Sequence, residues 1–168
     1  MTVSLYQVSI PQFQKTLVNL KAILKKGEDY AAAKKIDPSV MLNSRLYPDM
    51  FALTRQVQIA ADVAKGACAR LSGQEIPKFE DKEASFADLY ARIDKTLAYL
   101  ATFQPAQIDG QEEREIVFTA GGVERRFTGQ AYLLHWAAPN LFFHVMTTYA
   151  ILRENGVDVG KMDYLGSF

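Results

Sequence analysis

Four stretches of the chain repeat apolar residues at alternating steps of three and four, the spacing that lines one face of an α-helix. They occupy residues 4–35, 48–72, 85–104 and 128–156. Amphipathic helices of similar length bury such stripes most simply against one another. The pattern therefore predicts an all-α four-helix bundle, with residues 1–168 forming a single domain. The first and third connections are longer than antiparallel turns need, so the helix order need not be plain up-down-up-down.

The predicted helix ends depend on capping residues and prolines. Pro48 suits the first position of the second helix, where Asp49 would favour the positive end of the helix dipole. Ser85 caps the third helix and Thr128 the fourth. Pro11 leaves two alternatives, because the first helix either begins there or has a kinked earlier turn. The stripe residues are Ile10, Phe13, Leu17, Leu20 and Leu24, then Met50, Leu53, Val57, Ala60, Ala64, Ala67 and Leu71, then Phe86, Leu89, Ile93, Leu97 and Leu100, then Leu133, Trp136, Asn140, Phe143, Thr147 and Ala150.

Residues 115–128 change the apolar period from about 3.6 to 2, which indicates β-structure. Gly121 and Gly122 can adopt the positive φ angles of a two-residue hairpin turn. We therefore expect a small β-hairpin that lies on the bundle before the last long helix. In the register of that turn the facing pairs are Ile116 with Phe127, Phe118 with Arg125, and Ala120 with Val123.

Composition excludes several classes of partner and compartment. The chain is 49% hydrophobic and 23% charged with a formal net charge of zero, which argues against binding to nucleic acid or to an anionic membrane surface. No apolar run approaches the ~18 residues of a membrane span. The single cysteine, Cys68, excludes an internal disulfide and fits a reducing, cytoplasmic location, and we expect it to be a buried structural residue.

We expect any chemistry in the fourth predicted helix, where Pro139 interrupts the backbone hydrogen bonds and should kink the helix. Asn140 and His144 are four residues apart and so share one face. His135 lies nine residues before His144, about half a turn away on the opposite side. The two histidines therefore do not form a metal pair, and any metal site would need ligands from another helix.

Residues at the start of the second predicted helix could complete a pocket around His144. Asp49 is the best candidate carboxylate, and Tyr47 and Gln56 could line the same space. In one alternative His144 and Asp49 hold a divalent metal, with Asn140 adding a weak amide oxygen. In the other, His144 is a hydrogen-bonded core residue, and Asn140 satisfies the carbonyl group freed by the proline. No Gly-x-Ser-x-Gly motif or glycine-rich phosphate loop occurs.

Three stretches resemble an uncharacterised bacterial domain-of-unknown-function family in the DinB/YfiT-like superfamily of four-helix bundles. They are LYQVSIPQF, LYPDMFALTRQVQIAADVAKG and FTGQAYLLHWAAPNLFFHVMTTYAILRENGVDVGKMDYLG. The resemblance implies a bundle with crossover connections, often homodimeric, and in many members hydrolase or thiol-transferase chemistry. It also implies a divalent metal such as Zn, Ni or Fe, held by three histidines. His144 matches one of the three, a second falls at Asn140, and the third falls near Tyr47 to Asp49.

Three functions stay open at this point. The chain is an enzyme that acts on a small molecule at a polar, metal-assisted pocket. Alternatively, it has lost the three-histidine site and binds a small ligand without catalysis. In the third alternative it is a structural homodimer, for which the aromatic-rich fourth helix and the apolar tail (157–168) supply apolar surface to bury.

Overall fold

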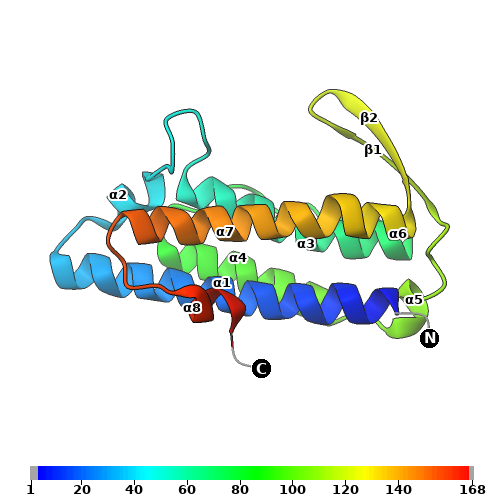
Figure 1. Ribbon diagram of the computed structural model, residues 1–168, viewed down its shortest axis with the longest axis horizontal. Coiled ribbons are helices and arrows are strands. Elements are labelled where there is room, and N and C mark those ends of the chain that lie inside the picture. The colour runs from blue at the N-terminus through cyan, green and yellow to red at the C-terminus, as the bar shows by residue number, and fades with distance from the viewer. Residues whose placement is uncertain (1–3, 167–168) are drawn as a thin grey trace.

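A computed structural model, which describes residues 4–166, contains four long helices that lie side by side (Figure 1). Shorter helices and one hairpin connect them, which confirms the predicted fold class. The elements are α1 (Leu5–Lys34), α2 (Pro38–Asn43), α3 (Leu53–Ser72), α4 (Phe86–Leu100), α5 (Pro105–Ile108), β1 (Glu115–Ala120), β2 (Val123–Thr128), α6 (Gly129–Tyr132), the π-helical turn η1 (Leu133–Ala137), α7 (Ala138–Glu154) and α8 (Lys161–Leu165).

The long helices do not alternate in direction. In Figure 1, α1 and α7 run one way, and α3 and α4 run the other way. Two hydrogen bonds tie α3 to the antiparallel rod of α6 and α7. His144 of α7 bonds Gln56 near one end, and Arg70 donates to Tyr132 of α6 near the other. Because α3 and α4 are parallel, the connection between them must return along the bundle before α4 can begin.

Helix α1 starts before Pro11, which settles the two alternatives left by the sequence. The hydroxyl group of Ser4 accepts a hydrogen bond from the backbone nitrogen of Gln7, and the helix runs unbroken from Leu5. Pro11 lies inside it on an exposed face. Its missing N–H leaves the carbonyl of Gln7 without a helical partner, and Gln7 is exposed, so water can replace that bond.

Helix α3 begins at Leu53, so the prediction that it begins at Pro48 is wrong. Pro48 and Asp49 are instead the two central residues of a turn in which the nitrogen of Met50 donates to the oxygen of Tyr47 at 2.9 Å. Proline takes the same φ angle at the second position of such a turn as at the start of a helix. The sequence signal is therefore ambiguous. The stripe from Leu53 to Leu71 is buried as expected, and Met50 lies outside the helix.

The buried stripe of the last long helix is displaced from the predicted one. The π-helical turn η1 adds one residue to a turn, so Ala137, Leu141 and Val145 face the core instead of Trp136, Asn140 and Phe143. Within η1 the nitrogen of Ala138 bonds the oxygen of Leu133, five residues back. The proline that follows lies at the second position of α7. Proline lacks a backbone N–H, but it lies just after the turn in which the helical hydrogen bonds change from the fourth to the fifth residue back. In Figure 1, α6 and α7 form one rod.

The hairpin has the predicted register in every pair. Gly121 and Gly122 both have positive φ angles, 60° and 76°, as a two-residue turn of this kind requires. Phe118, in the middle of β1, packs edge-on against Tyr132 and Trp136, and the turn of the hairpin rises away from the bundle (Figure 1). The hairpin therefore contacts the bundle from its base to its middle, and its turn projects.

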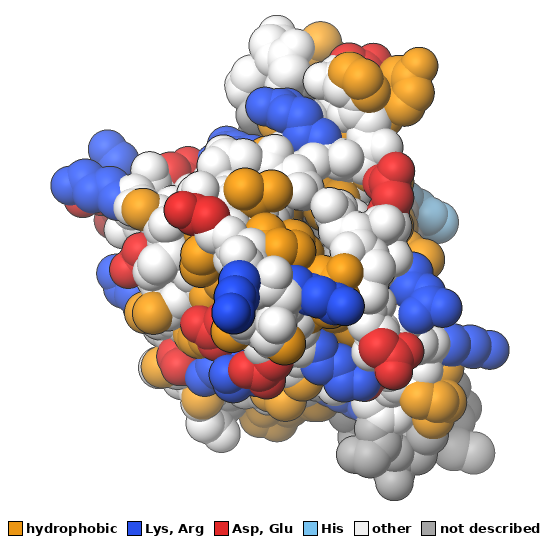
Figure 2. Space-filling view, turned by 90° about the vertical axis from the view of Figure 1, so that its left-hand side faces the viewer, with side chains coloured by type: hydrophobic (Ala, Val, Ile, Leu, Met, Phe, Trp, Pro, Cys, Tyr) orange, Lys and Arg blue, Asp and Glu red, His pale blue; other side chains and the backbone are white. Residues whose placement is uncertain are grey.

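The core is continuous along the four helices, and Cys68 lies in it fully buried, as predicted. Burial raises the pKa of its thiol to about 12. The apolar tail docks through Val157 and Val159, which are buried, whereas residues 167 and 168 lie outside the described part. At the end of the bundle shown in Figure 2, side chains of both charge signs are interspersed with apolar ones. Within residues 4–166, no helix is long and apolar enough to span a membrane.

Candidate functional site

His144 is a buried residue of α7 whose side chain is hydrogen-bonded across the bundle. Its Nδ1 lies 2.7 Å from Oε1 of Gln56 on α3. The amide nitrogen of Gln56 donates to the backbone oxygen of Phe51 at 3.0 Å. Because a carbonyl oxygen only accepts, this second bond fixes the orientation of the Gln56 amide and leaves its oxygen facing the imidazole. Nδ1 must therefore carry the hydrogen, and Nε2 keeps its lone pair.

The environment holds His144 in its neutral form. Burial first, and then the positive charge of Arg55, lower the pKa of the imidazole to about 4. Nε2 has no hydrogen-bond partner among residues 4–166, and it is not sealed from solvent. At neutral pH the ring can therefore accept one hydrogen bond from a molecule that approaches α7 from outside.

Asn140 lies one turn before His144 on α7 and is half-buried. Within the described residues its amide makes no hydrogen bond, so it does not satisfy the carbonyl freed by Pro139 as the structural alternative expected. His135 is exposed in η1 and away from this face. Of the residues proposed from sequence, the structure thus joins His144 and Gln56 directly, and Asn140 lies one helical turn from His144.

Asp49 and Tyr47 are not in the pocket that the sequence predicts. Both lie in the loop of residues 44–52, which projects from the bundle between α2 and α3 in Figure 1. Asp49 is exposed, and Tyr47 has 66% of its surface exposed. The loop is closed by a bond from the nitrogen of Leu53 to the oxygen of Ser44 at 2.9 Å, so these side chains precede α3 instead of lying in its first turn.

The residues present do not fit a resident divalent metal. In the described part of the chain, no group of three or more His, Cys, Asp or Glu side chains is placed to hold an ion. Protein sites for Zn²⁺ and similar metals use three or four such ligands. His144 has the orientation of a metal-binding imidazole, because its second nitrogen donates to an oxygen, but it is alone.

An apolar groove runs along the outer face of α7 beside these polar residues. Its volume is about 520 Å³ and no charged side chain lines it. Asn140 and Thr147 are seven residues apart and so share one face of α7, which places Asn140 at the border of the groove. Phe143 lines the groove and packs edge-on against the ring of His144, 5.3 Å between centroids. The lining residues are Leu46, Pro139, Phe142, Phe143, Met146, Thr147, Ala150 and Tyr164.

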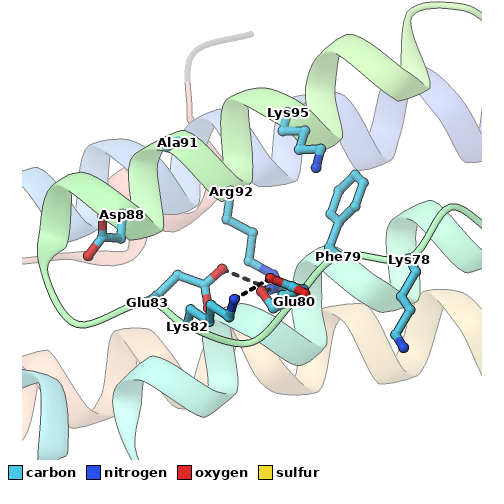
Figure 3. Close-up of a pocket in the computed structure, with 9 residues that line it drawn as sticks. All are labelled: Lys78, Phe79, Glu80, Lys82, Glu83, Asp88, Ala91, Arg92 and Lys95. Carbon is cyan, nitrogen blue, oxygen red and sulfur yellow. Dashed lines mark hydrogen bonds and ion pairs between the residues drawn. The ribbon is translucent and has the colours of Figure 1, made fainter.

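A second polar cluster, centred on Arg92, was missed from sequence. Arg92 of α4 is only 4% exposed, and its guanidinium group lies 2.8 Å from Glu83 and 3.0 Å from Asp81 in the connection before α4. On the other side it lies 2.9 Å from Asp62 of α3. Figure 3 shows Arg92 reaching from α4 to this connection. The one sequence feature that could have indicated this cluster is the alternation of Phe79, Asp81 and Glu83 at every second residue. Its composition alone identifies the segment only as a polar loop.

Comparisons with known proteins agree with this architecture. The model of a family described as domain of unknown function (DUF1993) matches residues 5–165. A crystal structure described as that of a DinB family member protein from Shewanella denitrificans is 46% identical in sequence. The match has a TM-score of 0.89 and covers 98% of this chain and 93% of that chain. A comparison with curated proteins finds no significant match.

Proposed function

From the premise that this chain belongs to the DUF1993 family and has the fold of DinB family proteins, we propose that it binds an uncharged, largely apolar small molecule in the groove along α7. The apolar part of the molecule lies against Phe142, Phe143 and Met146. Its polar end reaches the border of the groove, where Asn140 and Nε2 of His144 meet it. The observation that carries the proposal is a neutral, oriented imidazole in ring contact with Phe143, which lines a groove without charged side chains.

The same features favour binding over catalysis. An efficient general base has a pKa near the working pH, whereas that of His144 is about 4. The thiol of Cys68 is buried and stays protonated at neutral pH. A ligand pocket of this kind is typically apolar with a few polar groups that orient the ligand. The hydroxyl group of Tyr164, which has no partner among the described residues, can serve as a further polar contact.

The proposal is tested with N-phenyl-1-naphthylamine, a neutral aromatic amine whose fluorescence rises in apolar surroundings. We expect saturable enhancement with the wild type. Ala150→Phe places a ring in the groove and should remove most of the enhancement. The matched control Ala98→Phe adds the same ring at an exposed position of α4 and should leave binding unchanged. Equal binding by both variants would place the probe elsewhere and contradict the proposal.

A second proposal concerns the same face, because the outer side of α7 carries large apolar side chains that nothing in the described chain covers. Apolar surface of this kind often marks a protein–protein contact. Here Phe143 is 54% exposed and Met146 47% exposed, and the nearby loop exposes Tyr47 and Phe51. A surface without charge can pack against its own copy about a two-fold axis. We propose a homodimer through this face, located in the cytoplasm in line with the single cysteine.

The two proposals are separated by measuring mass and probe binding together. Light scattering of the wild type at tens of micromolar should give the dimer mass, and Met146→Glu should give the monomer mass. If the dimer covers the groove, the naphthylamine should bind only to dissociated protein. A wild type that is monomeric at this concentration would rule out the dimer and leave the ligand proposal standing.

A further inference from the structure

The connection between α3 and α4 covers a charged surface although it contains no buried residue of its own. We call residues 74–84 the strap, and every one of them is exposed or only half-buried. The strap returns along the parallel helices α3 and α4 and separates two hollows of about 620 and 540 Å³. Phe79 lines both hollows, so removing the strap would merge them into one trough.

The strap is held by alternate side chains. In an extended segment, residues two apart point to the same side. Phe79, Asp81 and Glu83 follow this rule, and all three contact the bundle. Asp81 pairs with Arg92 and Arg55, and Glu83 bonds Arg92 at 2.8 Å and the amide of Gln58 at 2.7 Å.

The aromatic ring of the strap lies between two lysines. The Nζ atoms of Lys65 on α3 and Lys95 on α4 lie 4.0 and 4.1 Å from the centroid of Phe79, which is the geometry of cation–π attraction. Figure 3 shows Phe79 rising from the strap toward Lys95, while Lys78 points away. The intervening Glu80 pairs with Lys82 of the strap itself. The strap therefore presents one side to the bundle and the other to solvent.

The surface beneath the strap is mainly cationic. It carries Arg55, Lys65, Arg92 and Lys95 against the carboxylates of Asp62 and Asp88. Asp88 is already engaged in capping α4 with Ser85. When the strap lifts, Asp81 and Glu83 leave with it, and the cationic side chains of the surface beneath the strap lose two of their partners. The guanidinium group of Arg92 then meets water, so the open state does not leave a charge buried without a partner.

We propose that the strap is a releasable internal occupant of this cationic trough, and that the trough binds in trans an extended acidic peptide of the same pattern. The pattern is an aromatic residue followed by acidic residues two and four positions later, as in Phe79, Asp81 and Glu83. Arginine and lysine clusters recognise such acidic segments through charge-assisted hydrogen bonds. The trough lies between α3 and α4 and does not depend on the groove along α7.

Opening of the strap is measured by limited trypsin digestion, because Lys78 and Lys82 are exposed cleavage sites within it. Cleavage of a locally opened segment follows the population of the open form. The variant Asp81→Asn/Glu83→Gln should be cut at these sites about tenfold faster or more than the wild type. The control Glu80→Gln alters a carboxylate that pairs with Lys82 of the strap itself and not with the surface beneath it, and this variant should be cut at the wild-type rate. Wild-type cleavage should also accelerate with salt.

Binding in trans is measured by fluorescence anisotropy with a labelled synthetic peptide of residues 76–85. The wild type should bind weakly, because its own strap competes at high effective concentration. Asp81→Asn/Glu83→Gln should bind at least about tenfold more tightly, and adding the exposed-site change Lys95→Gln should weaken this binding severalfold. A peptide of equal composition with Phe, Asp and Glu moved by one position should not bind.

Two results would overturn the inference. One is a folded Asp81→Asn/Glu83→Gln variant, with unchanged circular dichroism, that resists trypsin as the wild type does. The other is a folded, cleavable variant that binds the peptide no better than the wild type.

Discussion

The imidazole of His144 and the amide of Gln56 join α7 to α3 through a single hydrogen bond of 2.7 Å. The amide nitrogen of Gln56 also donates to the backbone oxygen of Phe51 in the loop. The same contact determines the tautomer of the histidine and the position of the loop. It is therefore the structural relationship on which both the stability of this end of the bundle and the proposed site depend.

Lowering the pH should destabilise the protein through His144. Its pKa is about 4 in the folded state and about 6.5 in the unfolded chain, so the unfolded state binds the proton first as pH falls. The stabilisation is complete above pH 6.5 and is lost progressively toward pH 4. Urea unfolding should show a loss of about 2 kcal/mol between pH 7 and pH 5. His144→Gln keeps an amide donor for Gln56 and should flatten this dependence. An equal slope in both proteins would refute the assignment.

Removing the amide of Gln56 should destabilise the bundle and loosen the loop. Gln56→Leu leaves the buried Nδ1 hydrogen of His144 without a partner, which costs about 1–3 kcal/mol, and it frees the oxygen of Phe51 in the exposed loop to bond water instead. Hydrogen exchange of residues 44–52 should increase more than that of α1. The control Gln14→Leu changes a half-buried glutamine on α1, far from this contact in sequence, and should have little effect. Unchanged exchange in the loop would count against the link.

The two predicted helix caps should differ in their effect on stability. Ser85 accepts from the backbone of Asp88 and is part of a reciprocal capping box, so Ser85→Ala should cost about 1 kcal/mol. Thr128 occupies the equivalent position before α6 but makes no capping bond through its side chain. Thr128→Ala should therefore change the free energy of unfolding by less than about 0.5 kcal/mol. Equal costs in urea titrations would mean that Thr128 caps in solution.

Protonation of Glu83 should release the strap in acid. Burial raises the pKa of its carboxyl group, but hydrogen bonds from Arg92 and Gln58 outweigh this effect and hold the pKa below its ordinary value. The strap is thus fully held above the ordinary pKa of a glutamate and freed as pH falls through the lower folded value. Asp62, Asp81, Arg55 and Lys65 belong to the same network, so the transition reports the whole cluster. Hydrogen exchange of residues 74–84 against pH checks this, and an exchange rate that follows only the intrinsic pH dependence would contradict it.

Sequence periodicity was sufficient for the bundle and for the hairpin register, because both arise from local patterns that one residue step would disrupt. It failed where one local signal suits two structures. Pro48 fits a turn as well as a helix start, and this ambiguity placed Asp49 in the site. The π-helical turn shifted the fourth stripe by one residue. This shift was not predicted, because the pattern of apolar residues does not reveal where backbone hydrogen bonds run to the fifth residue back.

The candidate site was predicted only in part, for the same physical reason. His144 and Gln56 lie on regular helix, where spacing determines the face, and the structure joins them by a hydrogen bond. The Arg92 cluster joins α4 to the connection just before it and to Asp62 of α3, and no local pattern predicts that a lone arginine will be buried with acids from a loop.

The most direct test of the central claim is a long-range ¹H–¹⁵N spectrum of the His144 ring at pH 6, with and without N-phenyl-1-naphthylamine. We predict a neutral ring that carries its hydrogen on Nδ1, with an Nε2 resonance typical of an unprotonated nitrogen that shifts when the probe is added. The shift should be absent in Ala150→Phe. Three results would contradict the claim that this histidine orients a neutral ligand in the groove of α7. They are a charged ring at pH 6, a hydrogen on Nε2, and an Nε2 resonance that does not shift when the probe binds.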